Sequence, residues 1–415
     1  MAIPVYELSH SGTRAEVFQS IGALTDAVSI QTSESIKAKI NTATVKFSNP
    51  KSQVTGRFKY ADIFRPDDEL SIKFSQGMVS GNVPTGFTRV MDSQIKEWDY
   101  DVDSKTRVLQ LKTDDISSKL LDYIAQIEHD ADTITARQLI IDTIESEVND
   151  KIDKQAALGE RSKIIVRDED GGLLPKEKSN GKPFEVMNHT NNYINKTMRQ
   201  VIDEMSIDTN TRDGNYIWWI QKIGEKSYLR WEPKPNTIDR QVNETECLSF
   251  NPSKSIYNVK NYFYLSCGES DAGNDIRTFS MDINSIAEIG FKESYYPYPD
   301  AARQARESDY SGTGLITETK RLCEIAGEKK LKELNTPRWK ADVTLKGTTD
   351  FNLANNIYLY SEGLGGDWVT DGPENNPTTE KPFQGFKLRI KTITQQYSEK
   401  GWQTKLGLEE DSEFD

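Results

Sequence analysis

The sequence predicts a β-rich α+β protein with two similar antiparallel β-barrel units, an inserted helical and small α/β domain, and a second helical excursion. Three observations lead to this fold class. Two long hairpins of similar pattern are predicted at residues 89–114 and 386–411. A short strand pattern precedes each hairpin, at 43–46 and 343–346, and helical periodicity lies between the copies. The shared order of these pieces indicates one β unit that occurs twice.

The two hairpins align at a constant offset of 297 residues. The aligned pairs share apolar or acidic character: Met91 with Leu388, Tyr100 with Tyr397, Leu109 with Leu406, Leu111 with Leu408 and Asp114 with Asp411. The predicted domains are residues 1–115 (first barrel), 116–245 (insertion) and 246–415 (second barrel, with the excursion at about 270–336).

Composition limits the possible functions. The 415 residues carry a formal net charge of −13, which argues against a general binder of nucleic acid or anionic membrane, because both need a basic face. A surface that lets nucleic acid pass without binding it stays possible. No run approaches the roughly 20 apolar residues of a membrane span, and no secretory signal is expected, so synthesis in the cytoplasm and no membrane anchor are predicted.

Residues that carry enzyme chemistry are sparse. The three cysteines, Cys247, Cys267 and Cys323, form no CxxC pair and are predicted to be reduced core residues. Only three histidines occur, without metal-ligand spacing, and no GxGxxG, GxxxxGK[ST] or GxSxG motif is present. The sequence therefore predicts no enzyme, no catalytic residue, no metal site and no cofactor.

Residues 1–115 alternate as short strands do, with segments at 4–8, 27–30, 40–47 and 68–74 before the first hairpin. Within that hairpin Trp98, Tyr100 and Val102 are expected on one face. The acidic residues are expected on the other, and these are Glu97, Asp99, Asp101 and Asp103. They form a solvated strand face or an acidic wall that lines a passage. A calcium loop is a third interpretation, although Ser104 and Gln110 replace the glycine and glutamate that an EF-hand loop needs.

Residues 116–160 and a segment within 184–206 are predicted to be largely helical. Aromatic strands follow at 216–220 and 227–231. Such strands can stack bases or sugars, but a helix beside them would cover them as core, and the core is the preferred interpretation.

Residues 256–268 are predicted to form a strand, and residues 295–299 (YYPYP) a rigid extended connector. Helices are expected near 300–306 and 316–334. The loop at 361–385 is rich in Gly, Pro and Asn and contains Trp368, which either anchors an interface or folds back on its own domain.

These features resemble the tail-hub family of phage baseplates, and also the hub half of secretion-system spike proteins. The resemblance rests on the paired units with an insertion, on residues 286–293 (IAEIGFKE) before a helix leading to Pro337-Arg338-Trp339, and on the closing hairpin with residues 401–406 (GWQTKL). It covers most of the chain, although no single motif is diagnostic. The sequence contains neither a spike nor a lysozyme module.

The resemblance implies a homotrimer in the virion tail tip, made in the host cytoplasm. Three chains with two barrels each would form a pseudo-sixfold ring between the sixfold tail tube, or a distal tail protein, and a threefold central spike. A tape-measure protein would be a further partner, and DNA would pass through the lumen without specific binding. The acidic residues at 97–103 would line that lumen.

Other interpretations remain open from the sequence. The hub of a tailocin or other contractile injection particle would have the same pattern. A carbohydrate-active enzyme could use paired carboxylates beside Trp218 and Trp219, and a glycan-binding adhesin could use the 361–385 loop. An adhesin would not need the internal duplication.

Overall fold

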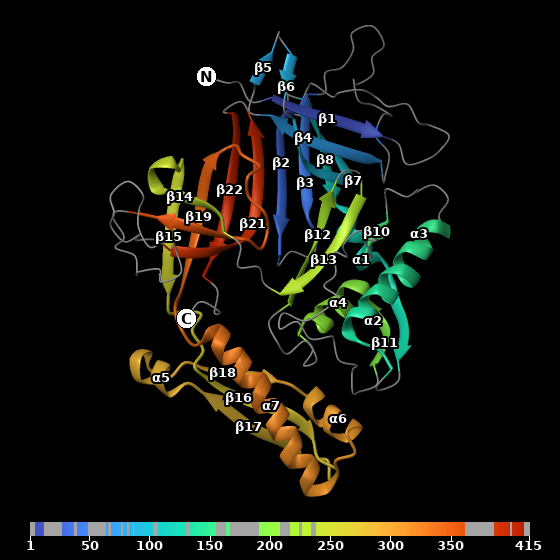
Figure 1. Cartoon of the computed structure of the whole chain (residues 1–415), viewed down its shortest axis with the longest axis vertical. Helices are drawn as coiled ribbons and strands as arrows, with labels where there is room; N and C mark the ends of the chain where they lie inside the picture. Colours follow the sequence, from blue (N-terminus) through green and yellow to red (C-terminus); the bar gives the residue numbers. More distant parts are fainter. Residues whose placement is uncertain are drawn as a thin grey trace.

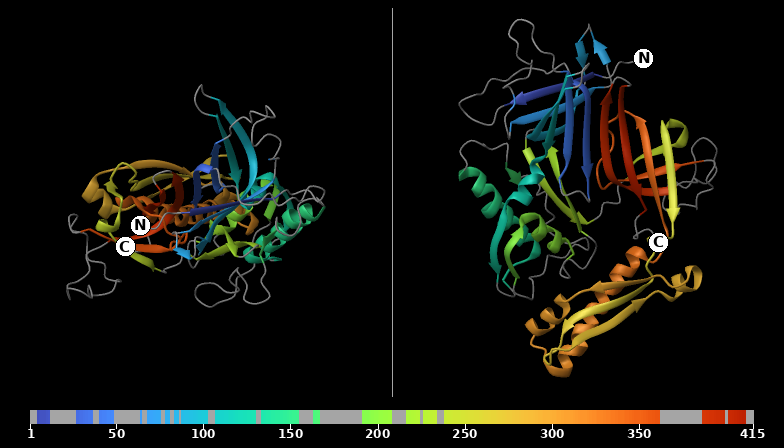
Figure 2. Two further views of the ribbon diagram at one scale, coloured as in Figure 1. Left: turned by 90° about the horizontal axis from the view of Figure 1, so that it is seen from above. Right: turned by 180° about the vertical axis from the view of Figure 1, so that it is seen from behind.

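The computed structural model describes residues 5–11, 27–36, 40–48, 64, 68–75, 78–80, 83–85, 87–102, 107–129, 133–154, 163–166, 191–207, 216–223, 226–233, 238–361, 386–398 and 401–410. The protein is β-rich, and a 12-stranded sheet forms its upper part (Figures 1 and 2). A helical domain and a smaller sheet with helices lie below this large sheet (Figures 1 and 2).

One half of the large sheet comes from the N-terminal part of the chain. We call this half the first β unit, and its strands in sheet order are β1 (Val5–Ser11), β4 (Glu69–Ser75), β7 (Thr88–Val102), β8 (Arg107–Asp114), β3 (Thr42–Ser48) and β2 (Ala27–Ser35). A separate small hairpin, β5 (Met78–Ser80) and β6 (Val83–Thr85), lies between β4 and β7 in the chain.

The other half comes from the C-terminal part, and we call it the second β unit. Its strands in the corresponding order are β14 (Ile238–Asn243), β20 (Asn356–Tyr360), β21 (Phe386–Ser398), β22 (Gly401–Glu409), β19 (Arg338–Lys346) and β15 (Ser249–Ser255). Both the chain order and the neighbours of the strands therefore repeat, which agrees with the predicted duplication of one β unit. One difference is that β1 pairs with β4 antiparallel, whereas β14 pairs with β20 parallel.

The strand registers correct the predicted alignment of the copies. The first strand of each long hairpin has a β-bulge. In β7 it lies between Ile95 and Glu97, and in β21 it lies between Ile390 and Thr392. When the bulges are superimposed, the pair Gln94–Asp114 corresponds to Arg389–Glu409. The hairpin offset is therefore 295 residues rather than 297. The prediction was wrong by two because a shift of two residues leaves a sequence pattern of period two unchanged, so the pattern does not fix the alignment.

The strands before the two hairpins also correspond. Ala43 lies opposite Thr113, and Ala341 lies opposite Leu408, so Ala43 corresponds to Ala341. The short strands predicted at 43–46 and 343–346 are therefore equivalent strands, at an offset of 298 residues. In both strands every second residue is buried, which fixes the register through the core.

Each β unit has its own hydrophobic core on one side of the sheet. The first is built from alternate residues such as Val45, Phe47 and Leu111, and the second from residues such as Val343, Ile357 and Leu406. Trp402 of the second unit joins the first core, where its ring stacks 5.1 Å from that of Phe74. The predicted closed barrels are not found among the described residues, where the strands of the two β units form one continuous open sheet.

The insertion after β8 is a domain with one core. Its elements are η1 (Ile116–Ser118), α1 (Lys119–Asp122), β9 (Ile124–His129), α2 (Ala136–Asp142), the π-helix η2 (Thr143–Asn149), α3 (Asp150–Lys154), β10 (Ile164–Ile165), β11 (Asn191–Thr197), α4 (Met198–Ile207), β12 (Tyr216–Ile223) and β13 (Lys226–Pro233). Trp218 and Trp231 are buried, and Trp231 Nε1 donates to Ser206 Oγ at 2.9 Å. The aromatic strands therefore belong to the core, which was the interpretation preferred from the sequence. The helix predicted within 184–206 begins only at Met198, after strand β11.

The excursion leaves the second β unit between β15 and β19. It contains β16 (Tyr262–Glu269), β17 (Asp275–Met281), α5 (Ile283–Ile289), β18 (Glu293–Pro297), α6 (Asp300–Glu307) and α7 (Gly312–Leu334). The short 3-10 helix η5 (Glu244–Glu246) precedes β15. Both predicted helices are present. The predicted connector at 295–299 is wrong in part, because Glu293–Pro297 pairs in parallel with β16.

Candidate assembly surfaces

The acidic stretch predicted in the first hairpin lies on strand β7. Glu97 and Asp99 point away from the core, and Lys112 Nζ of the neighbouring strand lies 3.0 Å from Glu97 and 3.1 Å from Asp99. These hydrogen bonds raise the pKa of Lys112. Asp101 continues the strand, whereas Asp103 and Trp368 lie outside the described residues. Because Asp99 is part of a continuous strand rather than a loop between two helices, the EF-hand interpretation is not supported.

Glu97 and Asp99 belong to a wider polar surface that both β units share. We define the polar face as the side of the large sheet opposite its cores. It carries mainly hydroxyl and amide side chains, among them Gln31, Ser33, Thr44, Thr344, Thr394 and Gln396. Lys46, Lys346 and Lys405 are exposed on the same side, so the charge of this face is mixed rather than uniformly acidic.

The two β units meet edge to edge at a junction between β2 and β21. One edge of β21 is divided, because its first half pairs with β20 and its second half, from Thr392 to Tyr397, pairs with β2. Glu34 lies opposite Ile393, and Ile36 N donates to Lys391 O at 3.1 Å. We call this pairing the internal junction.

The counterparts of the two junction strands have free edges among the described residues. On β7, the half from Thr88 to Gln94 pairs with β4, whereas the half from Glu97 to Val102 pairs with β8 alone. Strand β15, the counterpart of β2, pairs with β19 alone. Sequence reasoning did not identify which strands carry these edges, because a pattern of alternation does not say how many neighbours a strand has.

A cluster of acidic residues lies beside the internal junction. Burial raises the pKa of Glu34 to about 7, and the nearby charge of Asp115 adds to the shift. Burial also raises the pKa of Asp115 to about 6, although hydrogen bonds from Ser117 and Asn41 oppose that shift. Protonation of this cluster is therefore linked to the fold where the two β units join.

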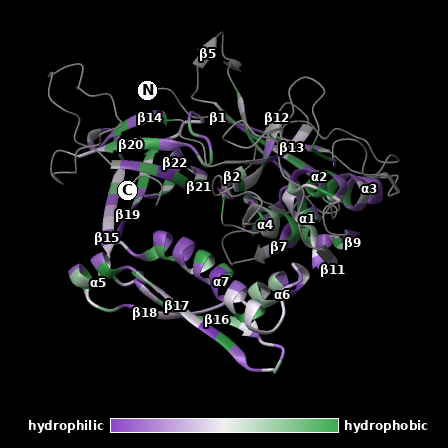
Figure 3. Ribbon diagram, turned by 60° about the horizontal axis from the view of Figure 1, so that its bottom comes forward, coloured by the Kyte–Doolittle hydropathy of each residue, from purple (hydrophilic) through white to green (hydrophobic). Residues whose placement is uncertain are grey.

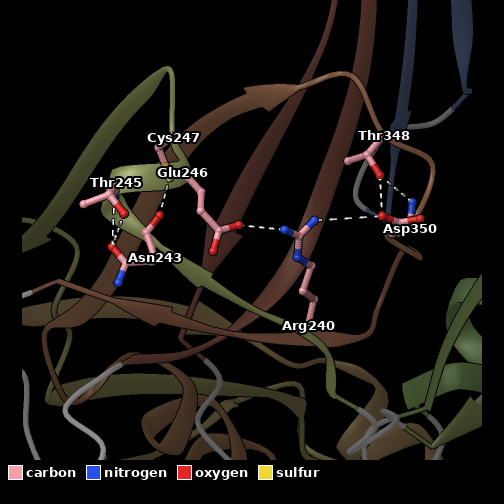
Figure 4. Close-up of polar contacts among 7 residues, drawn as sticks. All are labelled: Arg240, Asn243, Thr245, Glu246, Cys247, Thr348 and Asp350. Atoms are coloured by element: carbon pink, nitrogen blue, oxygen red, sulfur yellow. Dashed lines mark hydrogen bonds and ion pairs between the residues drawn. The ribbon is translucent and has the colours of Figure 1, made fainter. Parts of the chain in front are cut away.

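An arginine clamp holds the edge strand β14 in place (Figure 4). Arg240 donates to Glu246 at 2.6 Å and lies 3.9 Å from Asp350, so its guanidinium group lies between the 3-10 helix before β15 and the loop after β19 (Figure 4). Thr348 Oγ1 donates to Asp350 at 2.6 Å. The side chain of Asp239 also accepts from Asn352 N at 2.8 Å. These contacts fix the parallel pairing of β14 with β20.

The excursion has an aromatic face that no described element covers. Helices α6 and α7 pack on one side of its sheet, over Phe263 and Leu265 (Figure 3). On the other side Phe279, Tyr264 and Tyr295 lie in one row across the three strands and are 50%, 51% and 64% exposed. Sequence reasoning missed this face. The alternation of aromatic and apolar residues in 262–267 was the signal that could have found it.

Metal and membrane sites are not found in the described parts of the chain. No group of three His, Cys, Asp or Glu residues there could hold a metal ion, and no described helix is long and apolar enough to cross a bilayer. The three cysteines are free thiols. Cys267 and Cys323 are buried as predicted, and Cys247 is half-buried.

Comparison with known proteins gives a likeness at the level of fold. No family model and no curated protein matches the sequence. Among solved structures, the 43 kDa tail protein of prophage MuSo2 from Shewanella oneidensis matches with a TM-score of 0.59 at 12% identity, over 99% of this chain and 100% of that one. A tail protein from Neisseria meningitidis MC58 matches with a TM-score of 0.57 at 9% identity, over 99% and 98%. The prophage tail protein gp18 from Listeria monocytogenes EGD-e matches with a TM-score of 0.51 at 11% identity, over 98% and 95%.

Proposed function

We propose that this chain, which has the fold of phage tail proteins, is a structural hub subunit of a tail baseplate and assembles as a homotrimer. The main support for this proposal is that one chain contains two β units with the same six-strand order, joined edge to edge at the internal junction. Three such chains place six similar units in a ring. A ring of this kind offers sixfold positions to a tail tube from a threefold assembly.

The placement of the excursion supports the role of symmetry adaptor. It leaves the second β unit between β15 and β19, whereas the first unit joins the corresponding strands β2 and β3 through residues 36–41. The excursion and the insertion lie at the same end of the large sheet (Figure 1). In a trimer that end would carry threefold features, and the sheet would carry the sixfold ones.

The polar face is the proposed lining of the channel. Hydroxyl and amide side chains offer no dense cationic surface to phosphate groups, so DNA would pass without stable binding. Glu97 and Asp99 add repulsion, which Lys112 reduces by pairing with both. Asp101 and Asp103 are proposed to extend this lining.

The proposed partners are a central spike protein, the tail tube or a distal tail protein, and a tape-measure protein. The aromatic face of the excursion offers apolar surface to one of them, and the 361–385 loop with Trp368 stays a proposed interface. The proposed location is the virion tail tip, after synthesis in the host cytoplasm. The proposed role is structural rather than enzymatic.

A second candidate is the hub of a tailocin or other contractile injection particle. The lysines of the polar face favour it, since a passage used by DNA alone needs no cations, whereas protein cargo tolerates both signs. The genes that flank this one distinguish the two candidates.

The mass and shape of the purified protein test the proposed function. Light scattering and negative-stain imaging over a concentration series are expected to show a trimer with a central hole and a pseudo-sixfold outline. A stable dimer or a solid particle would contradict the ring. A monomer at every concentration, also when co-expressed with the neighbouring tail genes, would contradict it too.

A further inference from the structure

We infer that the ring closes by strand addition, in which β15 of one copy pairs antiparallel with the free half of β7 of the next copy. This inference rests on the proposed function, because it needs a ring of copies. It names the partner of each free edge as a second copy of this chain. Within one copy the two strands do not pair, and β8, β3, β2, β21, β22 and β19 lie between them in the open sheet.

The internal junction provides the template for this contact. Ile30 of β2 lies opposite Val45, and Phe250 of β15 lies opposite Val343, the counterpart of Val45, so β15 occupies the place of β2. The β-bulges lie at corresponding positions of β7 and β21, so β7 occupies the place of β21. The second half of β21 binds β2 along the edge that β7 leaves free. A copy of the internal junction therefore joins β15 to residues 97–102.

The template also fixes the register of the new contact. Ser33 pairs with Thr394 at the internal junction, and their counterparts are Ser253 and Asp99. Glu34 lies opposite Ile393 at the internal junction, so their counterparts Lys254 and Trp98 lie opposite each other in the inferred contact. On the polar face, β15 then presents serine hydroxyls to Glu97 and Asp99 and adds no carboxylate that would repel them.

Side-chain burial points to the same contact. At the internal junction Ile30 and Ile393 are 0% and 6% exposed. Their counterparts at the free edges, Phe250 and Trp98, are only half-buried. Tyr100, beside Trp98 on β7, is 47% exposed. Docking β15 on β7 covers these aromatic rings on the core side, which favours association.

Pro252 makes the inferred pairing weaker than its template. Ile36 N donates to Lys391 O, which places the N–H of every second residue of β2, Thr32 among them, on the β21 side. Pro252 is the counterpart of Thr32 and has no N–H, so the inferred ladder lacks this donor. A proline at this position also protects the edge of an unassembled copy from unspecific pairing.

A disulfide trap tests the register. In a Cys247→Ser background, Ser253→Cys is combined with Asp99→Cys. The inferred pairing places these two residues directly opposite each other at a position without mutual hydrogen bonds, where Cα atoms approach most closely. The matched control combines Ser249→Cys with Asp99→Cys, which displaces one thiol by about 13 Å along the strand. Dithiodiethanol, the disulfide of 2-mercaptoethanol, is the oxidant and is reduced to the free thiol as the new disulfide forms. Non-reducing gels and light scattering identify the products.

The expected result is covalent trimer from the test pair, at least tenfold more than from the control pair, with the ring visible by negative stain. Absence of covalent product at concentrations where the wild type is a ring overturns the pairing but leaves the proposed hub function intact. Equal yields from both pairs overturn the register. If the wild type is monomeric and the test pair gives no covalent oligomer at about millimolar concentration, the pairing and the ring both fail.

Discussion

Asn41 and Asp115 are bonded to each other twice. Asn41 Nδ2 donates to Asp115 Oδ2 at 2.8 Å, and Asp115 N donates to Asn41 O at 2.9 Å. The corresponding residues of the second β unit, Trp339 and Glu410, are also bonded twice. Trp339 N donates to the Glu410 carboxylate at 2.8 Å, and Glu410 N donates to Trp339 O at 2.8 Å. A carboxylate at this position thus closes the end of the hairpin in both units, although the residue types differ.

Replacement of these two carboxylates should have unequal effects. Asp115 is buried and also accepts from Ser117 N at 3.0 Å, so Asp115→Ala leaves buried donors unpaired and should cost about 2–3 kcal/mol. Glu410 is half-buried, and Glu410→Ala should cost about 1 kcal/mol. Hydrogen exchange of the β3–β8 and β19–β22 amides measures each loss locally. Equal losses at the two sites would contradict the role given to burial.

Acidic pH should stabilise the region around the internal junction. The folded-state pKa of Glu34 is raised to about 7, above its usual range, so the folded protein binds this proton more tightly than the unfolded chain. The unfavourable contribution is present above pH 7 and is relieved as the pH falls through 7 toward the unfolded pKa of about 4.5. Asp115, with a pKa of about 6, acts in the same direction.

Glu34→Gln should remove most of this dependence. We expect the variant to be more stable than the wild type at pH 8, by about 1–2 kcal/mol, and about equally stable near pH 5. Urea unfolding monitored by hydrogen exchange of the β2 and β21 amides gives the comparison. Glu97→Gln, at an exposed carboxylate, is the control, and an equal pH effect in both variants would refute the assignment.

The sequence predicted the repeat but not the way in which the repeats are joined. Alternation of apolar residues located β3, β7, β21 and β22, because one face of each strand is buried. The alignment of the two hairpins failed by two residues, because a shift of two leaves a pattern of period two unchanged. The pairing of β2 with β21 joins strands more than 350 residues apart, and no local pattern specifies such a contact. For the same reason the free edges and the aromatic face became visible only in three dimensions.

Two alanine substitutions on helix α7 should have opposite effects. A Cβ at Gly314 would meet only Tyr310, at an ordinary contact distance of 3.6 Å, so Gly314→Ala should stabilise the helix by about 0.5–1 kcal/mol. A Cβ at Gly327 would lie 2.5 Å from Ser280 Oγ and 2.7 Å from Leu265 Cδ1, so Gly327→Ala should destabilise the excursion by about 1–3 kcal/mol. Protection of the α7 amides in hydrogen exchange reports both. Stabilisation by Gly327→Ala would mean that α7 does not pack this closely on β16 and β17.

Pro252→Thr should strengthen the association of copies. Threonine is the residue at the corresponding position of the internal junction, where Thr32 is 1% exposed. The substitution restores one backbone donor, which contributes about 1 kcal/mol per contact and corresponds to about a fivefold lower dissociation constant. Sedimentation equilibrium over a concentration series measures the change. Pro297→Thr, at a proline of the separate β16–β18 sheet, is the control and should leave association unchanged. Because a threonine can only help where this edge receives another strand, unchanged or weaker association in Pro252→Thr would show that β15 remains a free edge in the assembly.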